Sequence, residues 1–353
     1  MTTSRFTAAA SPTTGARQVA NWLLLCAAMV FAMAIIGAIT RLTESGLSIT
    51  EWKPISGAIP PLSEAQWLAE FEKYKQIPEY QVLNRGMSLE EFKHIFFWEW
   101  FHRLWGRLIG IVFAVPLVWF AVKGMISRPM LPRLVGLFLL GGLQGFIGWF
   151  MVQSGLSERT DVSHYRLAMH LSMALILYAL LIRTALSLRH PGAGARAELA
   201  PLVWHGRAAL ALVGITVVWG AFVAGLDAGF AYNTWPTMNG DFMPPEVWNL
   251  SPAWLNFLEN TAAVQFTHRW LAIATALTVL TYVWRIGQRH DVAARAKQVA
   301  LGLAACVLAQ VGLGITTLLL AVPVALGAAH QGGAMVVIGL LVWSLHTLRR
   351  PGV

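Results

Sequence analysis

Eight stretches of about 20 mostly apolar residues recur along the chain, and they constrain its fold more than any other feature. A helix needs about 20 apolar residues to cross the hydrocarbon core of a bilayer. Only 12% of the 353 residues are charged, whereas about a quarter are charged in an ordinary soluble domain. We therefore expect an all-α integral membrane protein with eight transmembrane helices. The apolar runs begin near Trp22, His102, Leu134, Arg166, Ala208, Val264, Val299 and Gly327.

Basic residues gather in the two tails and in alternate connections between these runs, where only Glu198 and Asp291 oppose them. Because cytoplasmic loops carry the excess of Lys and Arg, both termini are predicted to lie in the cytoplasm. The net charge of +9 does not require a nucleic-acid partner, since the basic residues are spread over five short segments and not gathered on one face. These residues are Arg5, Arg17, Lys123, Arg128, Arg133, Arg183, Arg189, Arg196, Arg207, Arg285, Arg289, Arg295, Lys297, Arg349 and Arg350.

The second half of the sequence repeats features of the first half in the same order, which predicts an internal duplication. Because each half has four spans, an even number, we expect the halves to lie parallel in the membrane. We assign residues 1–20 to a cytoplasmic tail, 21–190 to the first half, 191–207 to a cytoplasmic linker and 208–353 to the second half. The matched pairs are Gly37-Ala38 with Gly220-Ala221, Gly46 with Gly229, Trp52 with Trp235, Gly57 with Gly240 and Pro61 with Pro244 at an offset of 183 residues, and His102-Arg103 with His268-Arg269, Gln144 with Gln310 and Gly148 with Gly314 at an offset of 166.

The longest extramembrane stretch, residues 41–98, has the pattern of a folded segment. The Ser-Glu-Ala-Gln sequence at 63–66 has the spacing of a capping box, and apolar residues follow at helical spacing over 67–74, which predicts a short amphipathic helix. Two roles are open for this helix, which could rest on lipid headgroups or cover a site in the bundle. A second capping signal at Ser88 predicts that the second transmembrane helix begins near Leu89, well outside the bilayer.

Four of the ten histidines lie near the outer ends of even-numbered helices, one pair in each half: His102, His170, His268 and His330. A lone histidine at such a position is more often a packed core residue, but four at equivalent places indicate ligands. Two imidazoles from facing helices, with no third ligand repeated in both halves, suit a six-coordinate haem iron better than zinc. A di-iron carboxylate site needs Glu-x-x-His on two helices, and only Glu99 with His102 has that spacing.

Three arginines lie beside these histidines: Arg103, Arg166 and Arg269. Haem carries anionic propionates, and arginine pairs well with carboxylates, so the three are candidates for propionate binding. The alternative is that their side chains only extend to the membrane surface.

The two halves differ at the position three residues before the histidine. In their alignment Glu99 falls on Gln265, which has a similar shape and no charge, and Arg107 falls on Ile273. An electron-transfer protein with two like haems has no evident need for a carboxylate beside one iron, whereas an enzyme that acts on a haem needs a base or a cation stabiliser. We therefore assign chemistry to the first half, with Glu99 as the catalytic candidate, and a permanent cofactor to the second. An ion pair between Glu99 and Arg103 is the competing interpretation.

With these features the chain resembles the haem A synthase family, membrane enzymes that convert haem O to haem A for cytochrome oxidase. The resemblance covers nearly the whole chain, and the stretch from 41 to 61 is much more specific than the hydropathy pattern. The residues that carry it are Arg-Leu-Thr-Glu-Ser-Gly-Leu-Ser at 41–48, Glu-Trp-Lys-Pro at 51–54, Gly57, Pro60-Pro61, Glu99, His102-Arg103 and the three later histidines.

The resemblance implies two four-helix bundles, in which His268 and His330 are the axial ligands of a haem b. It implies that His102 and His170 hold the iron of the substrate haem, and that Glu99 is the essential glutamate of the family. One branch of the family has a cysteine pair in an outer loop, which this sequence lacks. The chain is similar to the cysteine-free branch of proteobacteria and mitochondria, so an electron route through such a pair does not apply.

We therefore expect a haem-dependent oxidoreductase that oxidises the C8 methyl group of haem O stepwise to a formyl group, with the second haem relaying electrons. Glu99 would either stabilise positive charge at the methyl carbon or accept a proton, and both roles stay open. A di-haem, quinol-linked cytochrome without substrate chemistry is the alternative. The expected location is a bacterial inner membrane, with haem O synthase and oxidase assembly factors as candidate partners.

The predicted orientation places residues 41–98 and 227–263 on the periplasmic side of the membrane. Cysteines introduced at Ser63 and Asn239 should therefore react with a membrane-impermeant thiol reagent in intact spheroplasts. Protection of both sites until the cells are lysed would contradict the orientation.

Overall fold

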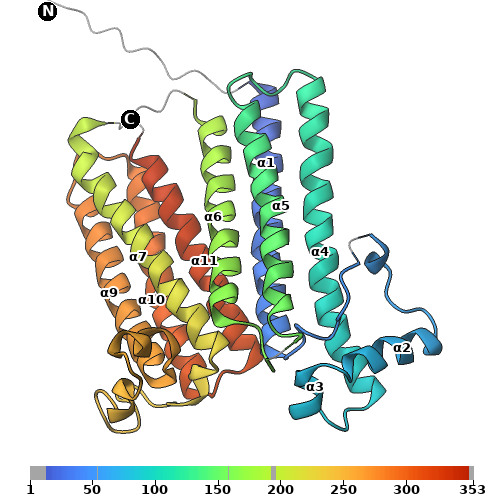
Figure 1. The fold of residues 1–353 in the computed structure, drawn as a ribbon. Helices are drawn as coiled ribbons and strands as arrows, with labels where there is room; N and C mark the ends of the chain where they lie inside the picture. Colours follow the sequence, from blue (N-terminus) through green and yellow to red (C-terminus); the bar gives the residue numbers. More distant parts are fainter. Residues whose placement is uncertain (1–12, 54, 158, 192–195, 350–353) are drawn as a thin grey trace, which may run out of the picture.

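The computed structural model describes residues 13–53, 55–157, 159–191 and 196–349, and its architecture is a bundle of long helices (Figure 1). Eight helices in these residues are long and apolar enough to cross a membrane, which confirms the predicted all-α membrane fold. The predictions on Arg5, Pro54 and Arg350, and on parts of the tail and linker, lie outside the described residues. The eight helices are α1 (Thr14–Leu42), α4 (Leu89–Val122), α5 (Leu131–Gln153), α6 (His164–Arg189), α7 (Ala200–Gly225), α9 (Thr261–Gly287), α10 (Ala294–Leu319) and α11 (Val324–Thr347).

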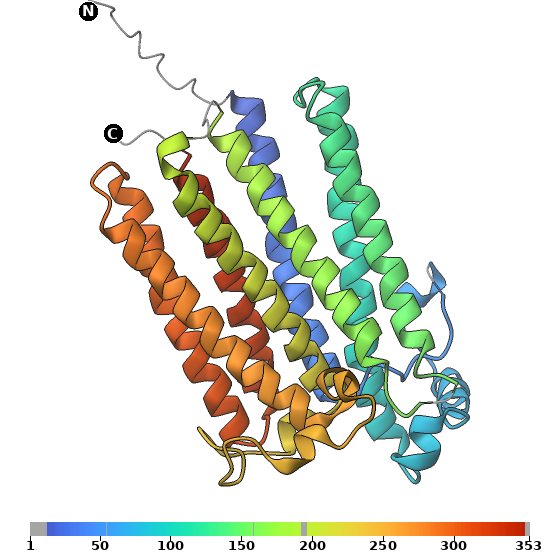
Figure 2. The same cartoon turned by 60° about the vertical axis from the view of Figure 1, so that its left-hand side comes forward.

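Each half of the chain forms a ring of neighbouring helices. In the first half α1 and α5 both contact α4 and α6, and in the second half α7 and α10 both contact α9 and α11. The rings meet where α6 lies against α7 and α11 lies against α1 (Figures 1 and 2). The α1–α11 contact is close, because a Cβ atom on Gly327 would lie 2.6 Å from Leu42 and one on Gly332 would lie 2.6 Å from Ile35. The parallel relation of the two halves stays a prediction.

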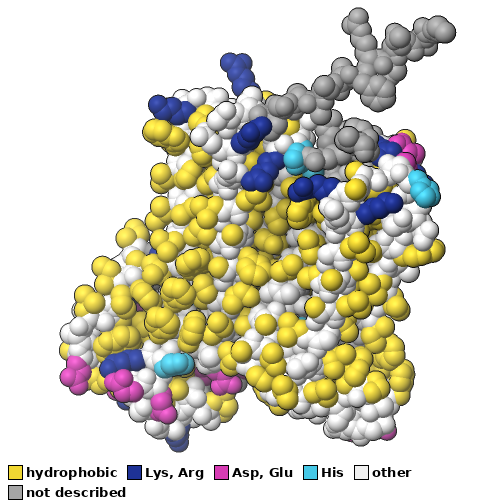
Figure 3. Space-filling model, turned by 180° about the vertical axis from the view of Figure 1, so that it is seen from behind, with side chains coloured by type: hydrophobic (Ala, Val, Ile, Leu, Met, Phe, Trp, Pro, Cys, Tyr) yellow, Lys and Arg dark blue, Asp and Glu magenta, His cyan; other side chains and the backbone are white. Residues whose placement is uncertain are grey.

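The surface of the bundle suits a bilayer. On the face shown in Figure 3 a broad apolar belt crosses the middle of the molecule. Lys and Arg side chains gather at the end that bears the chain termini, whereas a group of Asp and Glu side chains lies at the opposite end (Figure 3). Large apolar side chains are exposed on the outward faces of α4 and α5, where lipid would cover them: Val115, Val118, Trp119, Leu139 and Phe146.

The helices begin before their apolar runs, and α1 and α7 are two clear cases. Helix α1 begins at Thr14, and not near Trp22, because the Thr13 side chain accepts a backbone hydrogen bond in the first turn. Helix α7 begins at Ala200, inside the range assigned to a linker, and Pro201 suits its first turn. Hydropathy detects only the apolar part of a helix, so it misses the more polar turns that continue beyond it.

The outer segment of the first half folds into two short helices, α2 (Glu64–Tyr74) and α3 (Pro78–Val82), beside the beginning of α4 (Figure 1). Both predicted capping boxes are present, at Ser63 and at Ser88, and α4 begins at Leu89 as predicted. The remaining short elements are η1 (Ser56–Ala58), η2 (Ala197–Leu199), η3 (Ala228–Phe230), η4 (Pro245–Trp248), η5 (Ala253–Leu255) and α8 (Asn256–Glu259).

The apolar stripe of α2 packs against α4. The Phe71 ring stacks on the Phe92 ring with centroids 4.9 Å apart, and the Trp67 ring meets the Phe96 ring edge-on at 5.0 Å. Tyr74 is fully buried in the same cluster. Most of the stripe therefore faces protein, whereas Leu68 is exposed, and the choice between the two roles of this helix stays a prediction.

A buried carboxyl group lies within this outer layer. Glu79 in α3 is 3% exposed, and its Oε2 atom has no hydrogen-bond partner among the described residues. Burial, with the negative charges of Glu99, Asp161 and Glu44 nearby, raises the pKa of Glu79 to about 8, although a hydrogen bond with the Tyr74 hydroxyl opposes this shift. Glu79 is therefore expected to be mostly protonated at pH 7.

The raised pKa of Glu79 makes the stability of the outer layer depend on pH. Between about pH 4.5, the ordinary pKa of a glutamate, and about pH 8, the folded state holds a proton that the unfolded chain has released. Stability should therefore fall as the pH rises through this window. Glu79→Gln cannot ionise and should remove this dependence, so its residues 64–82 should be better protected from hydrogen exchange than those of the wild type at pH 9.

Glu72→Gln is the matched control, because Glu72 is exposed and pairs only with Lys75 at the surface. Hydrogen exchange, corrected for its intrinsic pH dependence, measures the effect. The same pH dependence of protection in the wild type and in Glu79→Gln would contradict a raised pKa for the Glu79 carboxyl group.

Candidate functional site

Each of the four candidate histidines lies against a glycine of the neighbouring helix. In the first half a Cβ atom on Gly37 of α1 would lie 3.2 Å from His102 Nε2, and one on Gly148 of α5 would lie 2.8 Å from His170 Cε1. A side chain at either glycine would therefore compete with the imidazole ring for space.

The second half repeats this arrangement. A Cβ atom on Gly220 of α7 would lie 3.0 Å from His268 Cε1, and one on Gly314 of α10 would lie 2.7 Å from His330 Cε1. The two glycines are the residues that the sequence comparison matched to those of the first half. The same pairing of imidazole and glycine thus occurs at four corresponding places.

The two candidate histidines of each half lie on helices of the same ring, and their role as a ligand pair stays a prediction. His102 and His170 lie within electrostatic range of each other, and so do His268 and His330. Helices α4 and α6 carry the first pair, and α9 and α11 carry the second.

Polar groups of neighbouring helices orient three of these rings. The side-chain amide of Gln144 contacts His170 Nδ1 at 3.1 Å, and that of Gln310 contacts His330 Nδ1 at 3.1 Å. His268 Nδ1 lies 3.1 Å from the backbone carbonyl of Thr216. The sequence comparison matched the two glutamines but assigned them no role, because contact with a histidine on another helix has no local signal.

The donor set in each half fits haem better than a zinc or di-iron site. No group of three or more His, Cys, Asp or Glu side chains that could hold a metal ion occurs in the described residues. A structural zinc site needs four such ligands, whereas haem iron takes its axial ligands from two side chains. Each half offers two imidazoles, and each imidazole lies beside a glycine of the neighbouring helix. This arrangement fits one haem in each half.

Glu99 is buried and has partners for both carboxylate oxygens. Its Oε2 atom accepts hydrogen bonds from the Ser48 hydroxyl and from the Ile49 backbone N–H, both at 2.7 Å. Its Oε1 atom accepts a hydrogen bond from Arg103 within the same helix. The ion pair considered as a competing interpretation is thus present, together with two donors from the outer segment that the sequence pattern did not indicate.

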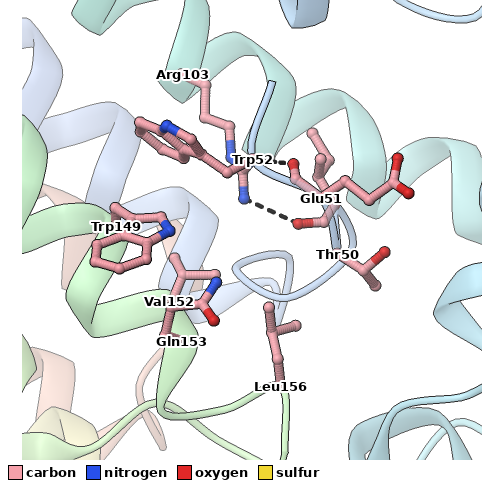
Figure 4. Close-up of a pocket in the computed structure, with 9 residues that line it drawn as sticks. Thr50, Glu51, Trp52, Arg103, Trp149, Val152, Gln153 and Leu156 are labelled. Carbon is pink, nitrogen blue, oxygen red and sulfur yellow. Dashed lines mark hydrogen bonds between the residues drawn. The ribbon is translucent and has the colours of Figure 1, made fainter. Parts of the chain in front are cut away.

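Arg103 also binds the outer segment of the first half. Its guanidinium donates to the backbone carbonyls of Ile49 at 2.9 Å and Glu51 at 3.2 Å, and it lies 5.8 Å from the ring of Trp52 (Figure 4). Trp149 of α5 lies beside these groups (Figure 4). The segment that follows α1 is therefore attached to the same turns of α4 that carry Glu99.

Arg269 makes the same contacts in the second half. It donates to the backbone carbonyls of Tyr232 at 2.8 Å and Thr234 at 2.9 Å, and it lies 5.8 Å from the Trp235 ring. Gln265 accepts a hydrogen bond from Arg269 at 3.0 Å, as Glu99 does from its own arginine. The contacts of Arg103 therefore recur at Arg269. The side chain one turn earlier is a carboxylate in the first half and an amide in the second half.

Arg166 and Arg107 make backbone contacts of their own. Arg166, in the first turn of α6, donates to the Phe150 carbonyl at 2.7 Å and lies 3.7 Å from the Phe150 ring. Arg107 donates to the Lys53 carbonyl at 2.9 Å and lies beside Gly57. Propionate binding by Arg103, Arg166 and Arg269 stays a prediction.

The fold and the site together define a multi-pass α-helical membrane protein with two half-buried imidazoles in each half. The chain belongs to the COX15-CtaA family of cytochrome oxidase assembly proteins, which matches residues 20–342. It is 66% identical to the heme A synthase of Rhodospirillum centenum over 99% of this chain and 94% of the relative. It is 50% identical to the heme A synthase of Parvibaculum lavamentivorans over 94% of each chain. It is 48% identical to that of Nitrosospira multiformis over 95% of this chain and 94% of the relative.

The contact between Gly314 and His330 leads to a testable prediction. Gly314→Ala places a methyl group against the imidazole, so it should lower the free energy of unfolding by about 1–3 kcal/mol, as overpacking of a core does, and displace the ring. Haem retained after purification and the midpoint of thermal unfolding measure the two effects.

Gly312→Ala on the same helix is the control, since a Cβ atom there has no neighbour within 4 Å. This variant should keep its haem, and it should gain about 0.5–1 kcal/mol because alanine favours the helix. Equal behaviour of the two variants would show that His330 does not occupy the space beside Gly314.

Proposed function

We propose that this protein is a haem A synthase that oxidises the C8 methyl group of haem O stepwise to a formyl group, giving haem A for cytochrome oxidase. Relatives of that name match the chain over nearly its whole length, and the four histidines supply an axial pair for a haem in each half. The long apolar bundle suits a substrate that is itself membrane-soluble.

One difference between the halves carries the assignment of roles. Glu99 and Gln265 occupy corresponding places in matching frameworks, each bound to an arginine one turn further along its helix. Only the first half therefore offers a carboxylate, which can accept a proton or stabilise a positive charge on the substrate. We assign the chemistry to the first half, with the substrate haem on His102 and His170.

The second half suits a permanent cofactor. His268 and His330 would hold a haem b, which when bound supplies one-electron redox chemistry. The Thr216 carbonyl would fix the His268 ring by accepting a hydrogen bond from Nδ1–H, as outer partners of metal-bound histidines do. The His330 ring is instead contacted at Nδ1 by the side-chain amide nitrogen of Gln310.

Propionate binding is assigned to Arg103, Arg166 and Arg269. An arginine has five N–H donors, so the carbonyl contacts of these residues leave donors for a carboxylate. Arg166 lies in the first turn of α6 and Arg269 eight residues after the start of α9, and Arg103 follows the part of α4 that is predicted to lie outside the bilayer. These positions support a common side for the propionates of both haems.

We place the protein in a bacterial inner membrane with both termini in the cytoplasm. The gathering of Lys and Arg at the end that bears the termini supports this orientation (Figure 3). The cysteine labelling described above tests it. Haem O synthase and oxidase assembly factors are the proposed partners, because the substrate and product are both poorly soluble in water.

The division of roles between the halves predicts distinct effects of the histidine variants. His268→Ala or His330→Ala should remove the resident haem b and lower stability, because a bound cofactor stabilises only the native state. His102→Ala or His170→Ala should spare haem b. Pigment extraction followed by chromatography measures both outcomes, and equal loss of haem b from the two sets would show that the halves are wrongly assigned.

Replacement of the carboxylate tests the enzymatic role directly. Glu99→Gln removes the charge with little change of size, so conversion of haem O to haem A per bound haem b should fall by roughly 10²- to 10⁴-fold. Bound haem O or the intermediate alcohol should accumulate.

Glu90→Gln in the first turn of the same helix is the control, since its side chain is exposed and pairs only with Lys93. It should convert haem O at the wild-type rate. Near-normal conversion by Glu99→Gln, even in a less stable protein, would reduce Glu99 to a structural partner of Arg103.

A further inference from the structure

We infer that Ser48 is a positioning residue for Glu99, and that the outer segment, more than the helix bundle, makes the first half the reactive one. The inference rests on the proposed function. The inference goes beyond the proposed function, because it names the groups that hold the Glu99 carboxylate and the reason why a carboxylate does not suit the corresponding position of the second half.

The contacts of Ser48 are short and buried. Its side chain is 1% exposed, and its hydroxyl lies 2.7 Å from Glu99 Oε2 but 3.1 Å from the backbone carbonyl of Ser45. A hydroxyl has one proton to donate, and the closer, charged acceptor is the stronger partner. The Ile49 backbone N–H donates to the same oxygen at 2.7 Å. Two donors from the outer segment therefore converge on one carboxylate oxygen.

Arg103 holds the other oxygen from within the helix. Glu99 is thus fixed at Oε1 by its own helix and at Oε2 by the outer segment. A glutamate side chain has several rotatable bonds, and restraint at both oxygens reduces the orientations that it can adopt. Removal of the Ser48 hydroxyl leaves the arginine contact in place and frees one side of the carboxylate.

The corresponding groups of the second half have the opposite polarity. Ala231 stands where the first half has Ser48, so no hydroxyl is available there. The amide of Gln265 instead donates to the backbone carbonyls of Ala228 at 2.7 Å and Tyr232 at 3.3 Å. The outer segment presents donors to the side chain in the first half and acceptors in the second.

This reversal of polarity decides which side chain each segment accepts. A carboxylate has only acceptor atoms, so at position 265 it would face two carbonyl oxygens without a proton between them. An amide at position 99 could offer its oxygen to the Ser48 and Ile49 donors, but its NH2 group would then face the Arg103 guanidinium, which is also a donor. The difference between Glu99 and Gln265 is therefore matched by the backbone around each of them.

The test measures conversion of haem O per bound haem b in Ser48→Ala. A hydrogen bond to a charged group is strong enough that its loss should lower conversion by roughly 10- to 100-fold, while haem b is retained. Ser45→Ala is the matched control, because Ser45 is equally buried in the same segment and its hydroxyl contacts Thr43 instead. The control should convert haem O within about twofold of the wild type.

A double-mutant cycle separates positioning from a merely structural role. Ser48→Ala in the Glu99→Gln background should cause little further loss, because Ser48 acts through the carboxylate. Ser48→Cys, nearly equal in size and a weaker donor, should convert haem O at a rate between the wild type and Ser48→Ala.

Three results would overturn the inference. These are wild-type conversion by Ser48→Ala, wild-type conversion by Ser48→Cys, and an equal loss from Ser48→Ala in the presence and absence of Glu99. Absence of any conversion by the wild-type protein would instead refute the proposed function, so the two failures are distinguishable.

Discussion

The guanidinium of an arginine close to lipid needs several hydrogen-bond acceptors, and meeting this need attaches the outer segments to the helices in both halves. Arg103 binds two backbone carbonyls of an outer segment and Arg269 binds three, and each also binds the side chain one turn earlier in its own helix. A charged side chain inside a bilayer costs about 3 kcal/mol or more when it is left without partners. The carbonyl contacts avoid this cost, and they fix the segments against the helices that carry His102 and His268.

The two sites share these arginine contacts and differ in which groups donate and which accept hydrogen bonds around Glu99 and Gln265. The carboxylate of Glu99 receives N–H and O–H groups, whereas the amide of Gln265 gives its protons to carbonyl oxygens. Both arrangements give the buried side chain hydrogen-bond partners, as buried polar groups require. A duplicated scaffold can thus hold a charged group in one copy and a neutral one in the other without any change in the helices.

Much of this architecture could be predicted from the sequence, because its signals are local. Apolar runs of sufficient length predicted the eight helices, and the spacing of Ser63 and Ser88 from their partners predicted both capping boxes. The histidine pairs could be predicted because the same residue type recurs at equivalent positions of successive helices. The start of α1 was misplaced because its first turns are too polar for a hydropathy window to include them.

The remaining features depend on contacts between distant segments. Ser48 and Glu99 are 51 residues apart, and nothing in either stretch indicates that they meet. The burial of Glu79 likewise results from α3 packing beside α4, since a glutamate in a short outer helix would ordinarily be exposed. The glycines beside the histidines were matched between the halves, but their role became visible only when the neighbouring helix was in place.

The close contact of α1 with α11 bears on the distance between the two candidate haem sites. Helix α1 supplies Gly37 beside His102, and α11 carries His330, so one helix of each site belongs to the boundary between the halves. Glycines at this boundary let the two backbones approach, which leaves little freedom for one half to slide along the other. With a haem in each half, the separation of the two irons would therefore be set by helix packing. Under the proposed function, electrons would pass between the two centres at a fixed distance, without a domain motion to time each transfer.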